Sequence, residues 1–148
     1  MSSNSITRRD FLRTAMAGAA LAALPPRAIP APNMLRAKVA RAPLVGGRGP
    51  QTEVWAYDGA VPGPELRFRQ GERLRLEIEN LLPEATTVHW HGVRVPNAMD
   101  GVPHLTQEPI KQDGGRFVYE FTLRDAGTYW YHPHLGAPEQ VGRGLYGR

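Results

Sequence analysis

The sequence predicts an all-β domain, a sandwich or barrel of short strands joined by turns. Apolar and charged residues alternate over short segments, most clearly from Arg73 to Asn80, and this period of two is typical of a half-buried strand. The 148 residues include 14 prolines and 16 glycines, which place turn signals between these segments. No segment of useful length in the body has a helical period, so the three observations together favour a β-sandwich.

The first 32 residues are predicted to be an export signal. A basic head with the adjacent arginines Arg8 and Arg9 precedes an apolar run from Ala15 to Leu24, which is too short to span a bilayer because a spanning helix needs about 20 residues. This order resembles the twin-arginine signal of bacteria. We therefore expect the twin-arginine export machinery to carry the protein to the periplasm, with cleavage near Ala31. A short amphipathic N-terminal helix is the alternative.

The rest of the chain is divided into a linker over residues 33–50 and a domain over residues 51–148. Residues 33–50 show little periodicity and contain many Ala, Arg, Gly and Pro residues, so we expect a linker or a poorly ordered first strand. Residues 92–112 form a long proline-rich loop, and long loops in compact domains are often functional. The strands of the domain are expected at 53–57, 66–69, 73–80, 86–91, 116–123 and 128–132.

Four of the five histidines stand in two His-x-His pairs, His89 with His91 and His132 with His134. Both pairs lie in segments rich in Thr, Val, Tyr and Trp, which favour strands. Because side chains alternate between the two faces of a strand, both members of a pair point the same way and lie about 7 Å apart. If the two strands are neighbours, four imidazoles converge on one patch. The pattern therefore indicates a metal site.

The residue types around the histidines favour copper. Imidazole alone is compatible with zinc, copper, iron and nickel. No Glu or Asp follows His91 at the spacing of a cupin site or a metallo-hydrolase, since the nearby positions hold Gly92, Val93, Val95 and Pro96. The chain has no Cys, which excludes disulfides, thiolate-bound zinc, thiol catalysis and any copper site that needs a thiolate.

Four other residues in or near these motifs receive different interpretations. Trp90 points away from the histidine face and is expected in the core. Trp130 shares the face of His132, so it either lines the site or packs in the core. His104 stands alone in the long loop and is expected to be exposed. Met99 is isolated, and we do not assign it as a ligand.

The formal net charge of +4 does not indicate nucleic-acid binding. Four of the 18 basic residues fall within the export signal, and positive and negative charges alternate in the strands, as between Arg73 and Glu79. Such alternation is typical of a solvated strand face. We therefore expect no nucleic-acid partner.

Several motifs, in the same order along the chain, resemble the multicopper oxidase family, which includes the laccase-like and copper-efflux oxidases. The similarity extends from Glu53 to Gly147, which is nearly all of the part expected to be exported. The motifs that carry it are Tyr57–Leu66, Val88–Gly92, Asp100–Pro103 followed by Thr106, Gln107, Pro109 and Ile110, and Ala126–His134.

This resemblance implies a cupredoxin fold, a Greek-key β-sandwich, as the first plastocyanin-like domain of a larger enzyme. Such an enzyme oxidises a small reductant, such as cuprous ion or a phenol-like compound, and reduces O2 to water at a trinuclear copper cluster. By the same resemblance, His89 would ligate the type 2 copper. His91, His132 and His134 would ligate the type 3 pair.

Two departures from the family pattern limit what the 148 residues are expected to do alone. The other cluster ligands, from a second His-x-His region and a His-Cys-His motif, are absent, and so is the Cys of the type 1 copper site. We therefore expect an inactive N-terminal fragment with an incomplete last strand, whose partner is the missing C-terminal cupredoxin domain. The alternatives are a stand-alone periplasmic copper-binding module and a non-enzymatic cupredoxin scaffold.

Overall fold

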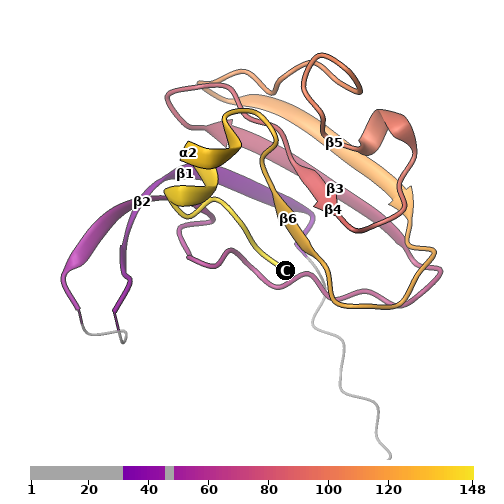
Figure 1. Cartoon of the computed structure of the whole chain (residues 1–148), viewed down its shortest axis with the longest axis horizontal. Coiled ribbons are helices and arrows are strands. Elements are labelled where there is room, and N and C mark those ends of the chain that lie inside the picture. The colour runs from indigo at the N-terminus through magenta and orange to yellow at the C-terminus, as the bar shows by residue number, and fades with distance from the viewer. Residues whose placement is uncertain (1–31, 46–48) are drawn as a thin grey trace, which may run out of the picture.

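Two β-sheets pack face to face around one main core (Figure 1). The computed structural model describes residues 32–45 and 49–148, so the predicted signal peptide, apart from Pro32, lies outside the described residues. The larger sheet has the strand order β2-β1-β3-β5, and the smaller sheet pairs β4 with β6. The predicted β-sandwich is therefore confirmed. The elements are β1 (Met34–Pro43), β2 (Gln51–Tyr57), β3 (Arg73–Leu81), β4 (His89–His91), η1 (Asn97–Met99), β5 (Gly115–Thr122), β6 (Trp130–His132) and α2 (Ala137–Gly142).

The strand β1 corrects the prediction of a linker over residues 33–50 and bears out the alternative of a first strand. It pairs antiparallel with β2 and parallel with β3, so it lies inside the larger sheet. The buried positions of β1 shift from odd-numbered to even-numbered residues along the strand. Leu35 and Ala37 face the main core. Ala42 instead packs in a second, small cluster with Val54 and Ala56. The phase change and the small alanines hide the period of two that marks the other strands.

A second correction concerns the strand predicted at residues 66–69, where no strand forms. The side chains of Leu66 and Phe68 do pack against the core, as their alternation requires. The backbone, however, makes no ladder there, although the Leu66 N–H donates to the carbonyl of Arg148 at 2.7 Å. Alternation therefore identified the inward side chains but not the pairing, which depends on neighbouring strands.

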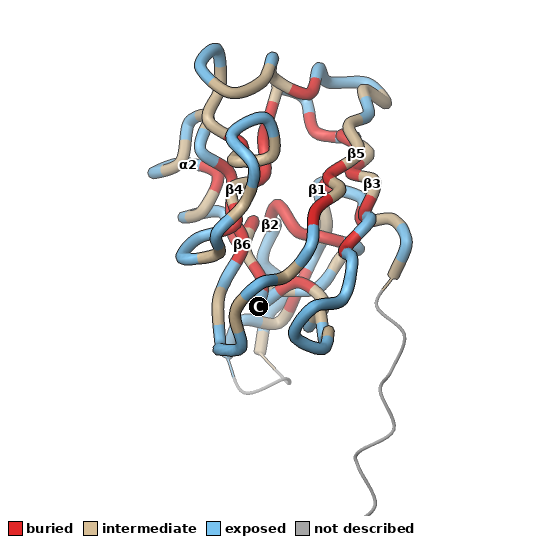
Figure 2. Tube along the Cα trace, turned by 90° about the vertical axis from the view of Figure 1, so that its right-hand side faces the viewer, coloured by how far each residue is buried: buried red, intermediate tan, exposed pale blue. Residues whose placement is uncertain are grey.

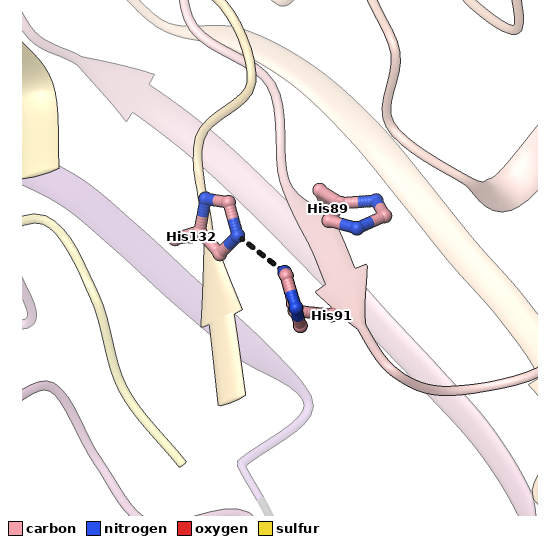
Figure 3. A group of neighbouring side chains, drawn as sticks. All are labelled: His89, His91 and His132. Carbon is pink, nitrogen blue, oxygen red and sulfur yellow. Dashed lines mark hydrogen bonds between the residues drawn. The ribbon is translucent and has the colours of Figure 1, made fainter. Parts of the chain in front are cut away.

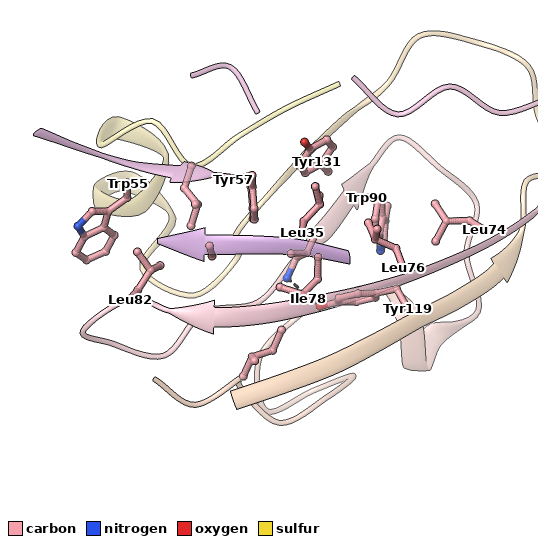
Figure 4. Close-up of a cluster of buried hydrophobic side chains, with 14 of the residues drawn as sticks. Leu35, Trp55, Tyr57, Leu74, Leu76, Ile78, Leu82, Trp90, Tyr119 and Tyr131 are labelled. Atoms are coloured by element: carbon pink, nitrogen blue, oxygen red, sulfur yellow. Dashed lines mark hydrogen bonds between the residues drawn. The ribbon is translucent and has the colours of Figure 1, made fainter. Parts of the chain in front are cut away.

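The strands β3 and β5 form the most regular part of the larger sheet, as predicted. They pair antiparallel from Arg73 to Asn80 of β3, which covers the whole of β5. Leu74, Leu76 and Ile78 of β3 face inward, as do Tyr119 and Phe121 of β5. Figure 4 shows Leu76 beside the Tyr119 ring, its cross-strand partner. This packing forms one wall of the core.

The smaller sheet forms the opposite wall of the core. Trp90 of β4 and Tyr131 of β6 are cross-strand partners, and both are buried in the main core, as predicted for Trp90. Figure 2 shows red, buried stretches on strands of both sheets. Because side chains alternate along a strand, the residues on either side of Trp90 and Tyr131 face away from the core. Three of the four paired histidines occupy these outward positions.

A short helix, α2, covers one end of the sandwich and was not expected from the sequence. Its six residues are too few for a helical period to be recognised. The helix is attached through Gln140, whose buried side-chain amide donates to the carbonyl of Ala85 at 2.9 Å. Within residues 32–45 and 49–148, no helix is both long enough and apolar enough to cross a bilayer.

Candidate metal centre

The pairing of β4 with β6 brings the two His-x-His motifs together. The strands run antiparallel, with His89 opposite His132 and His91 opposite Trp130, so the expectation that they are neighbours is confirmed. The strand β6 ends at His132, because the following Pro133 has no N–H to continue the ladder. His134 therefore reaches the same patch from just beyond the strand.

All four predicted imidazoles gather on the outer face of the smaller sheet. The ring of His89 is central, since its centroid lies 5.4 Å from that of His132 and 4.8 Å from that of His134. The His91 ring lies 5.6 Å from that of His89 and 5.5 Å from that of His132. One nitrogen from each of His89, His91 and His132 lies within 4.8 Å of the others (Figure 3). The cluster is open on one side, because His91 and His134 are exposed.

Two backbone carbonyls fix which ring nitrogens are free to bind a metal. His89 donates from Nδ1 to the carbonyl oxygen of Asp100 at 2.7 Å, and His132 donates from Nδ1 to that of Pro133 at 2.9 Å. A carbonyl only accepts, so Nδ1 carries the proton in both rings and Nε2 keeps its lone pair. Hydrogen bonds of this kind from the second ring nitrogen are usual in metal-ligating histidines.

Within the cluster, His91 Nδ1 lies 3.3 Å from His132 Nε2. Two nitrogens bound to one tetrahedral metal at about 2.0 Å lie about 3.3 Å apart. The candidate ligand atoms are all imidazole nitrogens, which suits copper and other metals that prefer nitrogen donors. The residues present therefore fit a bound copper ion.

The electrostatics of the cluster favour neutral imidazoles. Burial lowers the pKa of His132 below its usual value, and the neighbouring histidines lower it further, against the opposing effect of the Pro133 carbonyl. Burial also lowers the pKa of His134, and repulsion from His89 acts in the same direction. Because neutral imidazole is the metal-binding form, both shifts prepare the cluster for a cation.

Trp130 lines the site, which resolves the two alternatives left by the sequence. Its ring stacks on that of His132 with centroids 3.9 Å apart, and it lies 5.1 Å from the ring of His91. The side chain is 39% exposed, so it does not belong to the core. His104 is exposed, as predicted. Met99 packs against the core, where its sulfur accepts the N–H of Glu120 at 3.4 Å.

Two residues that were not predicted from the sequence lie against the histidines. Asp100 holds His89 through its carbonyl oxygen, and its carboxylate Oδ1 also lies 3.4 Å from the same Nδ1. The hydroxyl of Thr87 accepts the backbone N–H of His134 at 3.1 Å. The sequence feature that could have indicated Asp100 is its place in the long loop. For Thr87 that feature is its position two residues before His89, which puts it on the same strand face.

A β-sandwich that gathers four imidazoles on one sheet has the architecture of a metal-binding protein that favours nitrogen donors. Comparison with known proteins identifies the family. The sequence profile described as "Multicopper oxidase" matches residues 38–148, well over half of the chain. The chain therefore belongs to the multicopper oxidase family, and copper is the metal that this membership supports.

Similar proteins of known sequence and structure support the same assignment. The chain is 49% identical over 90 residues to "Copper resistance protein A homolog" of Pseudomonas syringae pv. tomato, covering 61% of this chain and 15% of that protein. It is 42% identical over 99 residues to "Copper resistance protein A" of Escherichia coli, covering 67% of this chain and 16% of that protein. The chain thus spans only a small part of these relatives.

Solved structures confirm the cupredoxin fold that the family resemblance implied. The crystal structure of Lac15 from a marine microbial metagenome is 46% identical, with a TM-score of 0.73, and the match covers 79% of this chain and 31% of Lac15. A multi-copper oxidase from Pseudomonas parafulva is 50% identical, with a TM-score of 0.71, covering 77% of this chain and 27% of that one. This chain corresponds to one domain of such oxidases.

The export prediction is also confirmed. The profile of the twin-arginine translocation signal matches residues 5–25, around the adjacent arginines Arg8 and Arg9. A protein with this signal leaves the bacterial cytoplasm by the twin-arginine route. The chain is therefore exported and periplasmic.

Proposed function

We propose that this chain supplies half of the ligands of a trinuclear copper cluster in a multicopper oxidase. In this proposal His89 ligates the type 2 copper, and His91, His132 and His134 ligate the type 3 pair. The observation that carries the proposal is the convergence of the four imidazoles, with His91 Nδ1 and His132 Nε2 only 3.3 Å apart. That contact leads us to assign these two histidines to the same copper ion.

The residues of this chain orient the ligands before any metal arrives. The carbonyls of Asp100 and Pro133 hold the Nδ1 protons of His89 and His132, so each Nε2 faces the cluster with its lone pair. Trp130 stacks on His132 and restricts rotation of that ring. Such preorganisation lowers the entropy that metal binding must otherwise cost.

The proposed reaction belongs to the whole protein rather than to this domain. A small reductant, such as cuprous ion or a phenol-like compound, would be oxidised, and O2 would be reduced to water. Copper supplies the one-electron steps and the affinity for O2 when it is bound. The remaining ligands and the type 1 site would come from a C-terminal cupredoxin domain.

Copper titration of the full 148-residue chain tests the proposed ligands. We expect Cu(II) binding with a nitrogen-dominated EPR spectrum, and a loss of at least tenfold in affinity for His132→Ala because one direct ligand is removed. His104→Ala is the matched control, since His104 is exposed and outside the cluster, and it should bind copper as the wild type does. Equal affinity of His132→Ala and His104→Ala would contradict the assignment.

The oxidase activity is tested on the whole protein of this proposal, including the C-terminal cupredoxin domain, isolated with its native copper from the producing bacterium. We expect consumption of O2 when cuprous ion or a phenol is supplied, and loss of consumption with His132→Ala. Copper binding without O2 consumption would instead favour the copper-binding module that the sequence left as an alternative.

A further inference from the structure

The hydrogen-bond ladder between β4 and β6 stops just where the fourth histidine is placed. The register pairs His89 with His132, and the same register continued by two residues would put Thr87 opposite His134. Pro133 ends the ladder because it has no N–H. The backbone of Thr86 has already turned to another neighbour, since its N–H and carbonyl pair with Ile110 at 3.0 and 2.8 Å. The backbone of His134 therefore needs another partner.

The side chain of Thr87 provides this partner. Its hydroxyl accepts the N–H of His134 at 3.1 Å and, more weakly, the N–H of Leu135 at 3.4 Å. Thr87 is fully buried, so water does not compete for the hydroxyl, and its bond to the His134 N–H is partly buried. A β-branched side chain such as Thr has few rotamers available, which fixes the direction of the hydroxyl.

We propose that Thr87 is a positioning residue for the copper site, acting through the backbone of His134. The ring of His134 is exposed and makes no side-chain hydrogen bond among the described residues, so its place beside His89, at 4.8 Å between centroids, depends on its backbone. Thr87 belongs to the segment that leads into His89. The Thr87 hydroxyl thus sets the distance between His134 and the first histidine pair. This inference rests on the proposed copper function.

The neighbouring Thr86 offers a matched control. Its hydroxyl is also buried and donates to Oε1 of Gln140 at 2.7 Å. That bond attaches α2 rather than a histidine. Thr86→Val and Thr87→Val therefore each remove one buried hydroxyl from the same segment, and only the second one bonds to His134.

The first measurement is amide hydrogen exchange of the metal-free full chain by NMR. We expect the His134 N–H to be protected in the wild type, exposed in Thr87→Val and protected again in Thr87→Ser, which restores the hydroxyl. Thr86→Val should leave the His134 N–H protected. Rapid exchange of this N–H in the wild type would overturn the inference without requiring any variant to fold.

The second measurement is Cu(II) affinity, for which Thr87→Ala replaces Thr87→Val if the latter does not fold. Loss of an interaction that orients a ligand typically weakens metal binding by about 10- to 100-fold. We expect that loss for Thr87→Val, and affinities within about threefold of the wild type for Thr87→Ser and Thr86→Val. Equal affinity of Thr87→Val and the wild type, or equal loss in Thr87→Ser and Thr87→Val, would overturn the inference.

These outcomes separate the positioning inference from the proposed function. If the wild type binds copper and Thr87→Val binds it equally well, the positioning role fails and the copper function stands. If the wild type binds no copper, the proposed copper function is wrong. The positioning role is then wrong as well, even if hydrogen exchange shows that the His134 N–H is protected.

Discussion

Gly101 lies where the long loop between β4 and β5 meets the segment that carries the first histidine pair. It is buried, and its φ of +77° is in the left-handed region. A Cβ at this position would collide with the backbone carbonyl of Val88, which cannot rotate away. The close approach places the carbonyl of Asp100, the preceding residue, against His89. At the scale of one residue, the absence of a side chain therefore helps to orient a proposed ligand.

We expect Gly101→Ala to lower the free energy of unfolding by about 2–4 kcal/mol. About 1 kcal/mol comes from the left-handed backbone, and about 1–3 kcal/mol from overpacking against Val88. Gly114→Ala is the matched control, because Gly114 has a φ of +94° but open space around it, so it should lose only the backbone contribution. Urea unfolding of both variants checks the prediction, and equal losses would show that the Val88 contact does not matter.

At the scale of elements, β5 is connected to the segment before β4 by the hydroxyl of Tyr119. This hydroxyl accepts the N–H of Val88 at 2.9 Å and donates to Oε1 of Gln107 at 2.8 Å. Tyr119 thus joins the larger sheet, the long loop and the residue next to His89. Tyr57 on β2 is equally buried, but its hydroxyl finds no hydrogen-bond partner within the part of the chain that the structure describes.

This contrast predicts that the same Tyr→Phe substitution has different effects on stability at the two positions. Tyr119→Phe should lower the free energy of unfolding by about 1–3 kcal/mol, because the N–H of Val88 would be left buried and unpaired. Tyr57→Phe should be neutral or slightly stabilising, since it removes a buried hydroxyl that has no partner. Thermal or urea unfolding of the two variants measures the difference. A larger loss for Tyr57→Phe than for Tyr119→Phe would contradict the hydrogen bonding described here.

At the scale of the whole molecule, the histidine cluster links folding stability to pH. The pKa values of His132 and His134 are lowered in the folded protein, chiefly by burial. The unfolded chain therefore binds more protons when the pH falls below the ordinary histidine value of about 6.5. Stability contributed by the neutral rings is present above that pH and is lost as the pH falls through the lower pKa values of the folded state.

We therefore expect the metal-free chain to become less stable between pH 7.5 and pH 5.5, measured by urea unfolding in the presence of a chelator. His132→Gln should show a smaller pH dependence over this range, because one of the two shifted groups is gone. The lowered pKa values of Glu65, Glu79 and Asp125 affect stability only at more acidic pH, since carboxyl groups titrate there. Stability that is constant or rises as the pH falls would contradict this linkage.

Much of the fold was predictable because several strands have a regular period. In β3 and β5, large apolar residues such as Leu76 and Tyr119 stand at every second position, mostly between charged ones, and that pattern depends only on local geometry. The strand β1 was predicted only as an alternative to a linker, because its inward residues are partly alanines and change from one core to another. Residues 66–69 alternate without pairing, because a ladder needs a neighbouring strand that alternation does not specify.

The sequence by itself determined the fold class, the export signal, the family, and the four histidines that are proposed to bind copper. All of these follow from local order, because spacing, alternation and motifs are properties of the chain as written. Tertiary structure decided which rings and which nitrogens meet. The β4–β6 register sets the contact between His91 and His132, and Asp100 and Thr87 come into position through the packing of segments distant in the chain. Such contacts depend on long-range packing, which local periodicity does not encode.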